Sequence, residues 1–551
     1  MPPERRIGRR QFLQGAVAAV GGAAVGEAFA SPASARRVPA HARHHRKRPA
    51  EVTQTVLESG VIVPTARWLV EENAQPGTLN WVVTGIQKPV AIEGFASQVS
   101  AVPGDELVLF VNTNAPSFHV EVYRMGYYQG LGGRLIDESD SYPGTPQPPP
   151  TVTPGVNTAS CPWNPSLTMK VSSAWLPGNY LLKLVGDGGQ QQYIPLTVRN
   201  DSSSAAYVLQ NSVTCWQAYN TWGGYSLYGK GANGTDYANR SRVVSFDRPY
   251  PQFWAQGAAD FFGNEFPVLY RMEQLGLDMT YWTDVDLHAR PNLLGKHKAL
   301  FSLGHDEYWS LEMRQGAQQA IQTGTNLAFL GANACYRQIR LQPSGVGPNR
   351  LQTCYKDASE DPISRVLPAL TTVDWNQAPL NDPENALIGS MYQSVRANAN
   401  LVVTDGSSWL WGGTGLTDGA TLPGVVQGEY DRFVPSLPGP ANVDVLAHSP
   451  VPGQANWSDI TYYTVPGGGG ALATGMASFV FKLSNTTAFP PNIVPAAIPG
   501  VTDLLLRAMD NVFANFGKGR ASAKQPSGGN GHAVYQGTAA LVGTPQGTNG
   551  A

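Results

Sequence analysis

Apolar and polar positions alternate with a period of two in short runs between residues 50 and 200. The clearest of these runs cover residues 107–111, 118–124 and 178–184, and turn residues such as Pro103-Gly104-Asp105 separate them. Alternation of this kind is typical of strands with one buried face, and several such strands at short spacing favour a β-sandwich. We therefore predict a sandwich domain over residues 56–200, followed by a short linker at 200–204.

The pattern changes after residue 205, where continuous apolar runs alternate with helical segments. Ser310 is a typical N-cap for a helix that continues through Ile321, and Gly324 is a typical stop. Buried strands are predicted at 206–209, 279–282, 299–303 and 326–330, and a further helix at 266–275. Alternation of strand and helix predicts an α/β domain with a mainly parallel sheet, here over residues 205–516.

The fold class is therefore multidomain β + α/β. An Ig/FnIII-like β-sandwich precedes a glutamine-amidotransferase-like α/β domain. The chain ends in a segment rich in Gly, Ser, Gln and Thr, residues 517–551, which we expect to be disordered.

The first fifty residues are basic, with ten Lys or Arg against two acidic residues, although the whole chain of 551 residues has a net charge of −2. Arg9-Arg10 precedes Phe12-Leu13, a weakly apolar stretch follows, and Ala33-Ser34-Ala35 resembles a cleavage site. This order predicts a twin-arginine signal peptide over residues 1–35 and a basic disordered linker over 36–55. We expect an exported protein in the periplasm, in the cell wall or outside the cell. A Sec signal or a basic disordered tail is the alternative.

The composition excludes several classes of protein. Charged residues make up 14% of the chain, which holds 60 Gly and 43 Pro, as expected for a folded protein rich in loops. No apolar run reaches the roughly 18 residues of a membrane span. Because the chain beyond the leader is acidic, nucleic acid is not an expected partner.

Four cysteines are present, and export permits disulfides. Cys335 and Cys354 flank a short segment, and we expect them to pair, while Cys161 and Cys215 stay free. Cys335 also follows a predicted strand, so it could instead act as the nucleophile of a Cys-dependent hydrolase. The G-x-S-x-G, H-E-x-x-H and Walker A motifs are absent from the sequence.

Phenols and carboxylates gather in segments that follow the predicted strands of the α/β domain. These segments are 215–229, 304–309 and 331–333, and a fourth cluster of charge lies at 428–432. Because the carboxyl ends of parallel strands meet at one edge of a sheet, we expect the first three to converge there. Two phenolates and one carboxylate would balance a trivalent, oxygen-preferring cation better than zinc.

Residues from about 90 to 515 resemble the large (β) subunit of N,N-dimethylformamidase and its relatives. In the sandwich, the resemblance rests on Ile92-Glu93-Gly94-Phe95, Pro103-Gly104-Asp105 and Glu121-Val122-Tyr123-Arg124. In the α/β domain, it rests on Ala218-Tyr219-Asn220, Ser226-Leu227-Tyr228, His305-Asp306-Glu307-Tyr308 and Glu429-Tyr430-Asp431-Arg432.

The resemblance implies a mononuclear Fe(III) bound by Tyr219, Tyr228 and Glu307. It further implies a catalytic role for Glu429, to which we add His305 and Asn333 as groups that steady the substrate or its oxyanion. The expected function is an exported amidohydrolase-like enzyme that hydrolyses the C–N bond of a small carboxamide with metal-activated water.

The chain also departs from the family enzyme. It is too short for that enzyme's additional lectin-like domain, and it carries an export leader. The need for a small partner subunit and the oligomeric state stay open. The alternative function is a secreted, non-catalytic binding protein for a glycan or a cell-surface ligand, suggested by Tyr123, Tyr127 and Tyr128 in the sandwich.

Overall fold

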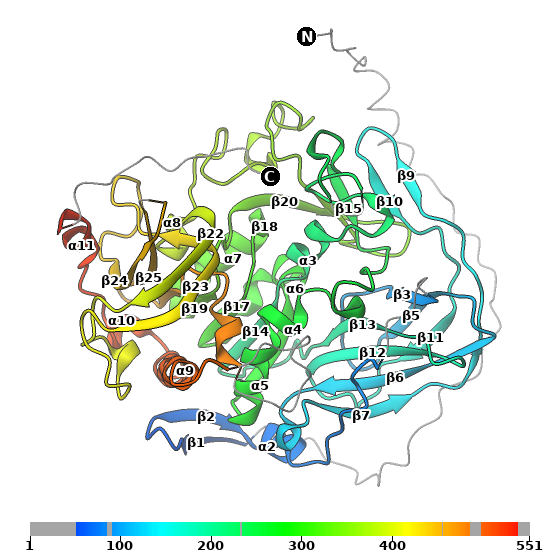
Figure 1. The fold of residues 1–551 in the computed structure, drawn as a ribbon, viewed down its shortest axis with the longest axis horizontal. Coiled ribbons are helices and arrows are strands. Elements are labelled where there is room, and N and C mark those ends of the chain that lie inside the picture. Colours follow the sequence, from blue (N-terminus) through cyan, green and yellow to red (C-terminus); the bar gives the residue numbers. More distant parts are fainter. Residues whose placement is uncertain (1–50, 85–90, 232–233, 455, 485–496, 538–551) are drawn as a thin grey trace. The chain divides into compact units, whose positions relative to one another are not determined.

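The computed structural model describes residues 51–84, 91–231, 234–454, 456–484 and 497–537 (Figure 1). The predicted signal peptide and residues 36–50 of the predicted linker lie outside the described residues. The described residues all belong to one compact unit. Within them, no helix has both the length and the apolar character that crossing a membrane would require.

Two antiparallel sheets form the N-terminal part, as the alternating pattern predicts. One sheet has the order β11 (Leu167–Lys170), β5 (Glu106–Thr113), β3 (Ile92–Ala96). The other runs β4 (Ser100–Ala101), β13 (Gln191–Val198), β12 (Gly178–Gly186), β6 (Ser117–Met125), β7 (Gly133–Glu138), and β8 (Tyr142–Pro143) also pairs with β6. Alternate side chains of both sheets, among them Leu107, Leu109, Val120 and Val122, meet in one buried core. This packing of two sheets gives the sandwich its interior.

The second part is built on a mixed, mainly parallel sheet. Its order is β16 (Met279–Thr283), β14 (Tyr207–Asn211), β17 (Ala299–Leu303), β19 (Asn326–Leu330), β26 (Gly470–Ala473), β25 (Asn456–Thr464), β24 (Asp444–Val451). The strands from β16 to β26 are parallel, and β25 and β24 are antiparallel additions. The parallel strands confirm the α/β prediction. The helices in this part are α3 (Val213–Tyr219), α4 (Phe261–Asn264), α5 (Phe266–Gln274), α6 (Asp284–Ala289), α7 (Leu311–Thr323), α8 (Asn385–Ile388) and α9 (Thr502–Phe516).

Helix α7 shows how local sequence sets the limits of an element. The Ser310 hydroxyl accepts a hydrogen bond from the amide of Met313, as a helix N-cap does. Gly324 has φ 115°, a left-handed conformation that ends the helix at little steric cost. Both ends agree with the prediction.

Smaller sheets complete the fold. They are the hairpins β1 (Val52–Val56) with β2 (Ile62–Ala66), β9 (Thr151–Thr153) with β10 (Thr158–Ser160), and β22 (Met391–Val402) with β23 (Thr421–Arg432). A further sheet has the order β15 (Val243–Ser245), β21 (Leu351–Thr353), β20 (Arg337–Gln342), β18 (Tyr308–Ser310). The short helix α2 (Arg67–Asn73) follows β2.

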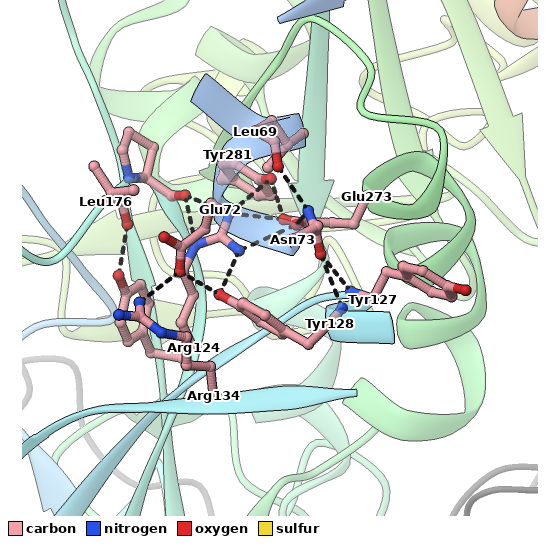
Figure 2. A network of polar contacts seen from close by, with 12 residues as sticks. Leu69, Glu72, Asn73, Arg124, Tyr127, Tyr128, Arg134, Leu176, Glu273 and Tyr281 are labelled. Carbon is pink, nitrogen blue, oxygen red and sulfur yellow. Dashed lines mark hydrogen bonds and ion pairs between the residues drawn. The ribbon is translucent and has the colours of Figure 1, made fainter. Parts of the chain in front are cut away.

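A buried ion pair joins the sandwich to the α/β part. Arg124 on β6 donates two hydrogen bonds to Glu273 on α5, at 2.7 and 3.1 Å, and neither side chain has any exposed surface (Figure 2). The same guanidinium donates to the Pro177 carbonyl oxygen at 2.9 Å and to the Tyr281 hydroxyl at 3.2 Å. Asn73 of α2 adds a 2.6 Å hydrogen bond to Glu273. Because every charge here is hydrogen-bonded, the network fixes the packing of three separate segments.

The structure corrects two predictions of disorder. Strand β1 begins at Val52 and pairs along β2, so residues 52–55 are not part of a disordered linker. The predicted tail contains α10 (Ala521–Lys524) and α11 (Gly531–Gly537) within the described residues. The side chain of Tyr535 is buried and packs on Phe433 and Trp457. The Val445 amide also donates to Asn530 Oδ1 at 2.6 Å, so aromatic packing and hydrogen bonds together hold a segment whose Gly/Ser composition is typical of a loop.

The predicted Cys335–Cys354 disulfide is wrong. All four cysteines are free and buried. The β20–β21 hairpin pairs Arg340 with Thr353, and this register, continued by one residue, sets Cys354 against Ile339. Ile339 is four residues from Cys335, which lies in the turn before β20 with φ 52°. The two thiols consequently lie in different hydrophobic clusters.

The alternative role of Cys335 as a nucleophile is also disfavoured. Its side chain has no exposed surface. Burial raises the pKa of its thiol to about 12, and the nearby Arg314 only partly opposes that shift. A neutral thiol without access to solvent is not a nucleophile.

Removing Arg124 should destabilise the protein strongly. We expect Arg124→Met to lower the free energy of unfolding by about 3–5 kcal/mol, because Glu273 would keep a buried charge without its partner. The matched control is Arg67→Met, which breaks exposed ion pairs with Glu51 and Glu71 and should leave the free energy of unfolding almost unchanged. Urea denaturation followed by circular dichroism measures both. Equal losses in the two variants would contradict a structural role for the buried pair.

Thiol counting tests the corrected disulfide assignment. Denatured protein that has never met a reductant should show all four cysteines reacting with a thiol reagent. A count of two, restored to four by prior reduction, would mean that a disulfide forms after all.

Candidate metal centre

Three neighbouring strands deliver the segments that the sequence singled out. Helix α3 follows β14, residues 304–307 follow β17, and residues 331–333 follow β19. Strands β14, β17 and β19 are adjacent and parallel, so these segments start from the same edge of the sheet (Figure 1). The predicted convergence is therefore confirmed for the backbone.

The side-chain oxygens of Tyr219, Tyr228 and Glu307 meet at one point. The Tyr219 hydroxyl lies 2.9 Å from Glu307 Oε2, and the Tyr228 hydroxyl lies 2.6 Å from the same atom. The two hydroxyls are 2.6 Å apart, and the two rings stack with their centroids at 4.2 Å. The structure thus brings the three predicted ligand residues together, while their role as metal ligands stays a prediction.

Glu307 is a buried carboxylate, with 1% of its side chain exposed. Arg337 Nε donates to its Oε1 at 2.8 Å. Burial on its own would raise the pKa of Glu307, but Arg337, then His305 and Lys356, outweigh it and hold the pKa below its usual value. Oε1 is therefore occupied by an arginine, and Oε2 faces the phenols as an anion.

The two phenols respond in the opposite direction. Burial, followed by the charge of Glu307, raises the pKa of Tyr219 and of Tyr228 well above the usual value for a phenol. Only a strongly positive ion among these oxygens would favour the phenolate form. The cluster is thus a set of hard oxygen donors whose charge depends on a cation.

His305 connects this cluster to Glu429. Its Nε2 lies 2.9 Å from Glu429 Oε2 and 3.6 Å from Glu307 Oε2. Burial lowers the pKa of His305. The neighbouring Cys215 and Glu429 have the opposite and larger effect, so the pKa of His305 lies well above its usual value. We therefore treat the ring as an imidazolium between two carboxylates.

Asn333 approaches the same nitrogen of this histidine. Its Nδ2 lies 3.4 Å from His305 Nε2, and its backbone amide donates to Asp431 Oδ1 at 2.8 Å. The residue has φ 58°, a left-handed conformation that asparagine tolerates better than most side chains. The β22–β23 hairpin, which carries both Glu429 and Asp431, thereby holds the turn after β19 in place.

Cys215, His305 and Glu307 form a second donor set. One ligand atom from each lies within 4.8 Å of the others, which makes a potential mononuclear metal site. Burial raises the pKa of the Cys215 thiol to about 12, against the influence of His305. Glu307 belongs to both donor sets, so a metal at either set uses the same carboxylate.

An open pocket of about 490 Å³ leads to these residues. Tyr219, His305 and Cys215 line it, together with the aromatic rings of Trp216, Phe253 and Trp254. A pocket of this size accommodates a small organic molecule.

Sequence reasoning missed two cations of the site. Arg337 lies only a few residues beyond the end of β19. This position after a predicted strand is the one sequence signal that could have identified it as a site residue. Lys356 lies after β21, and its Nζ is 3.4 Å from the centre of the Tyr228 ring. Burial, then Arg337, lowers the pKa of Lys356 to about 7. The sequence holds no sign of this contact, because the β20–β21 hairpin creates it.

One comparison with known proteins gives a match that spans this part of the chain. A family model described as N,N-dimethylformamidase beta subunit-like, C-terminal, matches residues 119–490. No curated protein matches the chain. The matched span contains Tyr219, Tyr228, Glu307, Glu429 and every other residue of the cluster described above.

Proposed function

The chain belongs to the N,N-dimethylformamidase beta subunit-like family, and on that basis we propose that it is an Fe(III)-dependent amidohydrolase acting on a small carboxamide. The observation that carries the proposal is the meeting of two phenol oxygens and one carboxylate oxygen within 2.9 Å of one another. We further propose that its α/β part is of the glutamine-amidotransferase type and that its sandwich is of the Ig/FnIII type.

The chemistry of the donors favours a hard trivalent ion over a soft divalent one. Two phenolates and one carboxylate supply three negative charges, and oxygen donors prefer hard cations. The alternative set of Cys215, His305 and Glu307 would suit zinc. It competes less well because His305 is already engaged by Glu429 at 2.9 Å.

When bound, ferric iron supplies Lewis acidity, which polarises an amide carbonyl and lowers the pKa of water. The protein residues supply the remaining parts. Arg337 holds the Glu307 carboxylate in one orientation through its 2.8 Å hydrogen bond. Lys356, above the Tyr228 ring, balances part of the negative charge of the cluster.

Glu429 is the proposed general base. Its carboxylate has 21% exposure, lies beside the cluster and is held by His305. It accepts a proton from the attacking water and returns that proton to the nitrogen of the leaving amine, so that the C–N bond breaks without forming an amide anion. His305 and Asn333 donate hydrogen bonds to the oxygen on which negative charge develops.

The structure gives less support to the alternative function, a non-catalytic binding protein. That alternative was suggested by aromatic residues of the sandwich that could form a ligand-binding surface. Tyr123 and Tyr128 are buried, with 1% and 0% exposure, and Tyr128 belongs to the Arg124 network. Tyr127 is partly exposed and packs edge to face on Tyr270. Two of the three rings are therefore not available to a glycan.

Export by the twin-arginine route remains part of the proposal. That route carries proteins already folded, often with their metal in place. Four buried, free thiols are compatible with folding in a reducing compartment before export.

Metal content distinguishes the two donor sets. We expect Tyr219→Phe to lose most of its iron, because one charged donor is removed, and Cys215→Ser to keep it. Glu307 belongs to both donor sets, so Glu307→Gln should lose the metal whichever set binds it, and its metal content is the reference for full loss. Elemental analysis of folded, purified variants gives the answer. Loss of metal in Cys215→Ser with retention in Tyr219→Phe would assign the site to the sulfur-containing set.

The base is tested by activity at constant metal content. Glu429→Gln should lower kcat/KM for release of amine from small carboxamides by about 10²–10⁴-fold, because proton transfer is lost while the donor oxygens remain. Glu71→Gln, an exposed change on α2, is the matched control. If Glu429→Gln retained full activity with normal iron, another group would be the base.

A further inference from the structure

We propose that the pocket beside the oxygen cluster recognises an organic cation, so that the substrate is a carboxamide with a quaternary or protonated amine on its far side. The inference deepens the proposed function and rests on it for the reacting amide. The recognition of a cation rests on the pocket alone. Two features carry it, an aromatic wall and an unpaired carboxylate.

The aromatic wall consists of Trp216, Phe253 and Trp254. The Trp216 ring is fixed by its 3.0 Å hydrogen bond to Glu265, and both tryptophans meet Tyr250 edge to face, at 6.2 and 5.9 Å between centroids. Phe253 is 73% exposed, which is unusual for a large apolar side chain. The faces of such rings carry partial negative charge and attract ammonium groups.

The unpaired carboxylate is that of Asp260, which lines the same pocket. In the part of the chain that the structure describes, Asp260 forms no ion pair, and Asn264 Nδ2 is the donor to its Oδ2. No Lys or Arg stands among the described residues that line the pocket. A carboxylate that forms no ion pair and lines a pocket together with aromatic rings is complementary to a cation on the ligand.

The geometry orients such a ligand. Tyr219 and His305 line the pocket and also belong to the oxygen cluster, where the amide would react. His305 Nε2 lies 2.9 Å from the Glu429 carboxylate, and no ion pair joins His305 to Asp260 among the described residues. The amide end of the ligand would therefore lie at the cluster and the cationic end at Asp260.

A pair of isosteric probes tests the cation directly. Choline carries a trimethylammonium group, and 3,3-dimethylbutan-1-ol has a neutral tert-butyl group of the same shape in its place. We expect calorimetry on the full-length, iron-loaded protein to show that choline binds at least about tenfold more tightly, as one cation–π and carboxylate site allows.

Two variants locate the preference. Asp260→Asn should weaken choline binding at least about fivefold and leave the neutral alcohol unchanged, as expected from the loss of one attractive charge. Phe253→Leu keeps an apolar side chain but removes the ring, and should likewise weaken choline alone. Phe253 is exposed, so this variant should fold even if Asp260→Asn does not. Asp187→Asn removes an exposed charge on the sandwich and is the control.

Equal affinity of wild-type protein for the two probes would overturn the inference, and so would a preference for choline that survives both Asp260→Asn and Phe253→Leu. Selective binding of choline with no hydrolysis of any amide, charged or neutral, would instead contradict the proposed function and leave the cation pocket standing. Hydrolysis of neutral amides without selective choline binding would contradict the cation pocket and leave the proposed function standing.

Discussion

The Glu307 carboxylate is a negative charge buried in the protein interior. The surrounding residues are arranged to balance that charge. Arg337 binds one of its oxygens, the phenols of Tyr219 and Tyr228 lie against the other, and His305 and Lys356 stand nearby. A buried charge without such partners would cost several kcal/mol. The same arrangement leaves three side-chain oxygens facing one another, and it is among these that we propose a metal ion binds.

The fold assembles this group from parts that lie far apart in the sequence. Parallel strands β14, β17 and β19 end side by side and supply Tyr219, Glu307 and Asn333 from three successive segments. The β22–β23 hairpin adds Glu429, and the β20–β21 hairpin leads to Lys356. The parallel sheet therefore positions Tyr219 and Glu307, while the two hairpins bring Glu429 and Lys356 beside them. On the sandwich side, the Arg124–Glu273 pair fixes the packing against helix α5.

Local sequence predicted the elements whose limits are set locally. Ser310 and Gly324 mark the ends of α7 because a side-chain cap and a left-handed glycine act within one turn. Contacts that depend on register or on distant packing could not be predicted in this way. The hairpin register separates Cys354 from Cys335. Burial of Tyr535 and the hydrogen bonds of Asn530 hold a segment whose composition indicates disorder. The positions of Tyr219, Tyr228 and Glu307 were predicted because each lies in a motif that resembles one family. Arg337 and Lys356 lie in no such motif.

Anomalous X-ray diffraction at the iron edge, on crystals of protein purified with its native metal, tests the central claim most directly. We expect one peak within bonding distance of the Tyr219 and Tyr228 hydroxyl oxygens and of the Glu307 carboxylate. A peak on Cys215 Sγ and His305, or a fully ordered cluster with no metal in repeated preparations, would contradict the proposed iron centre.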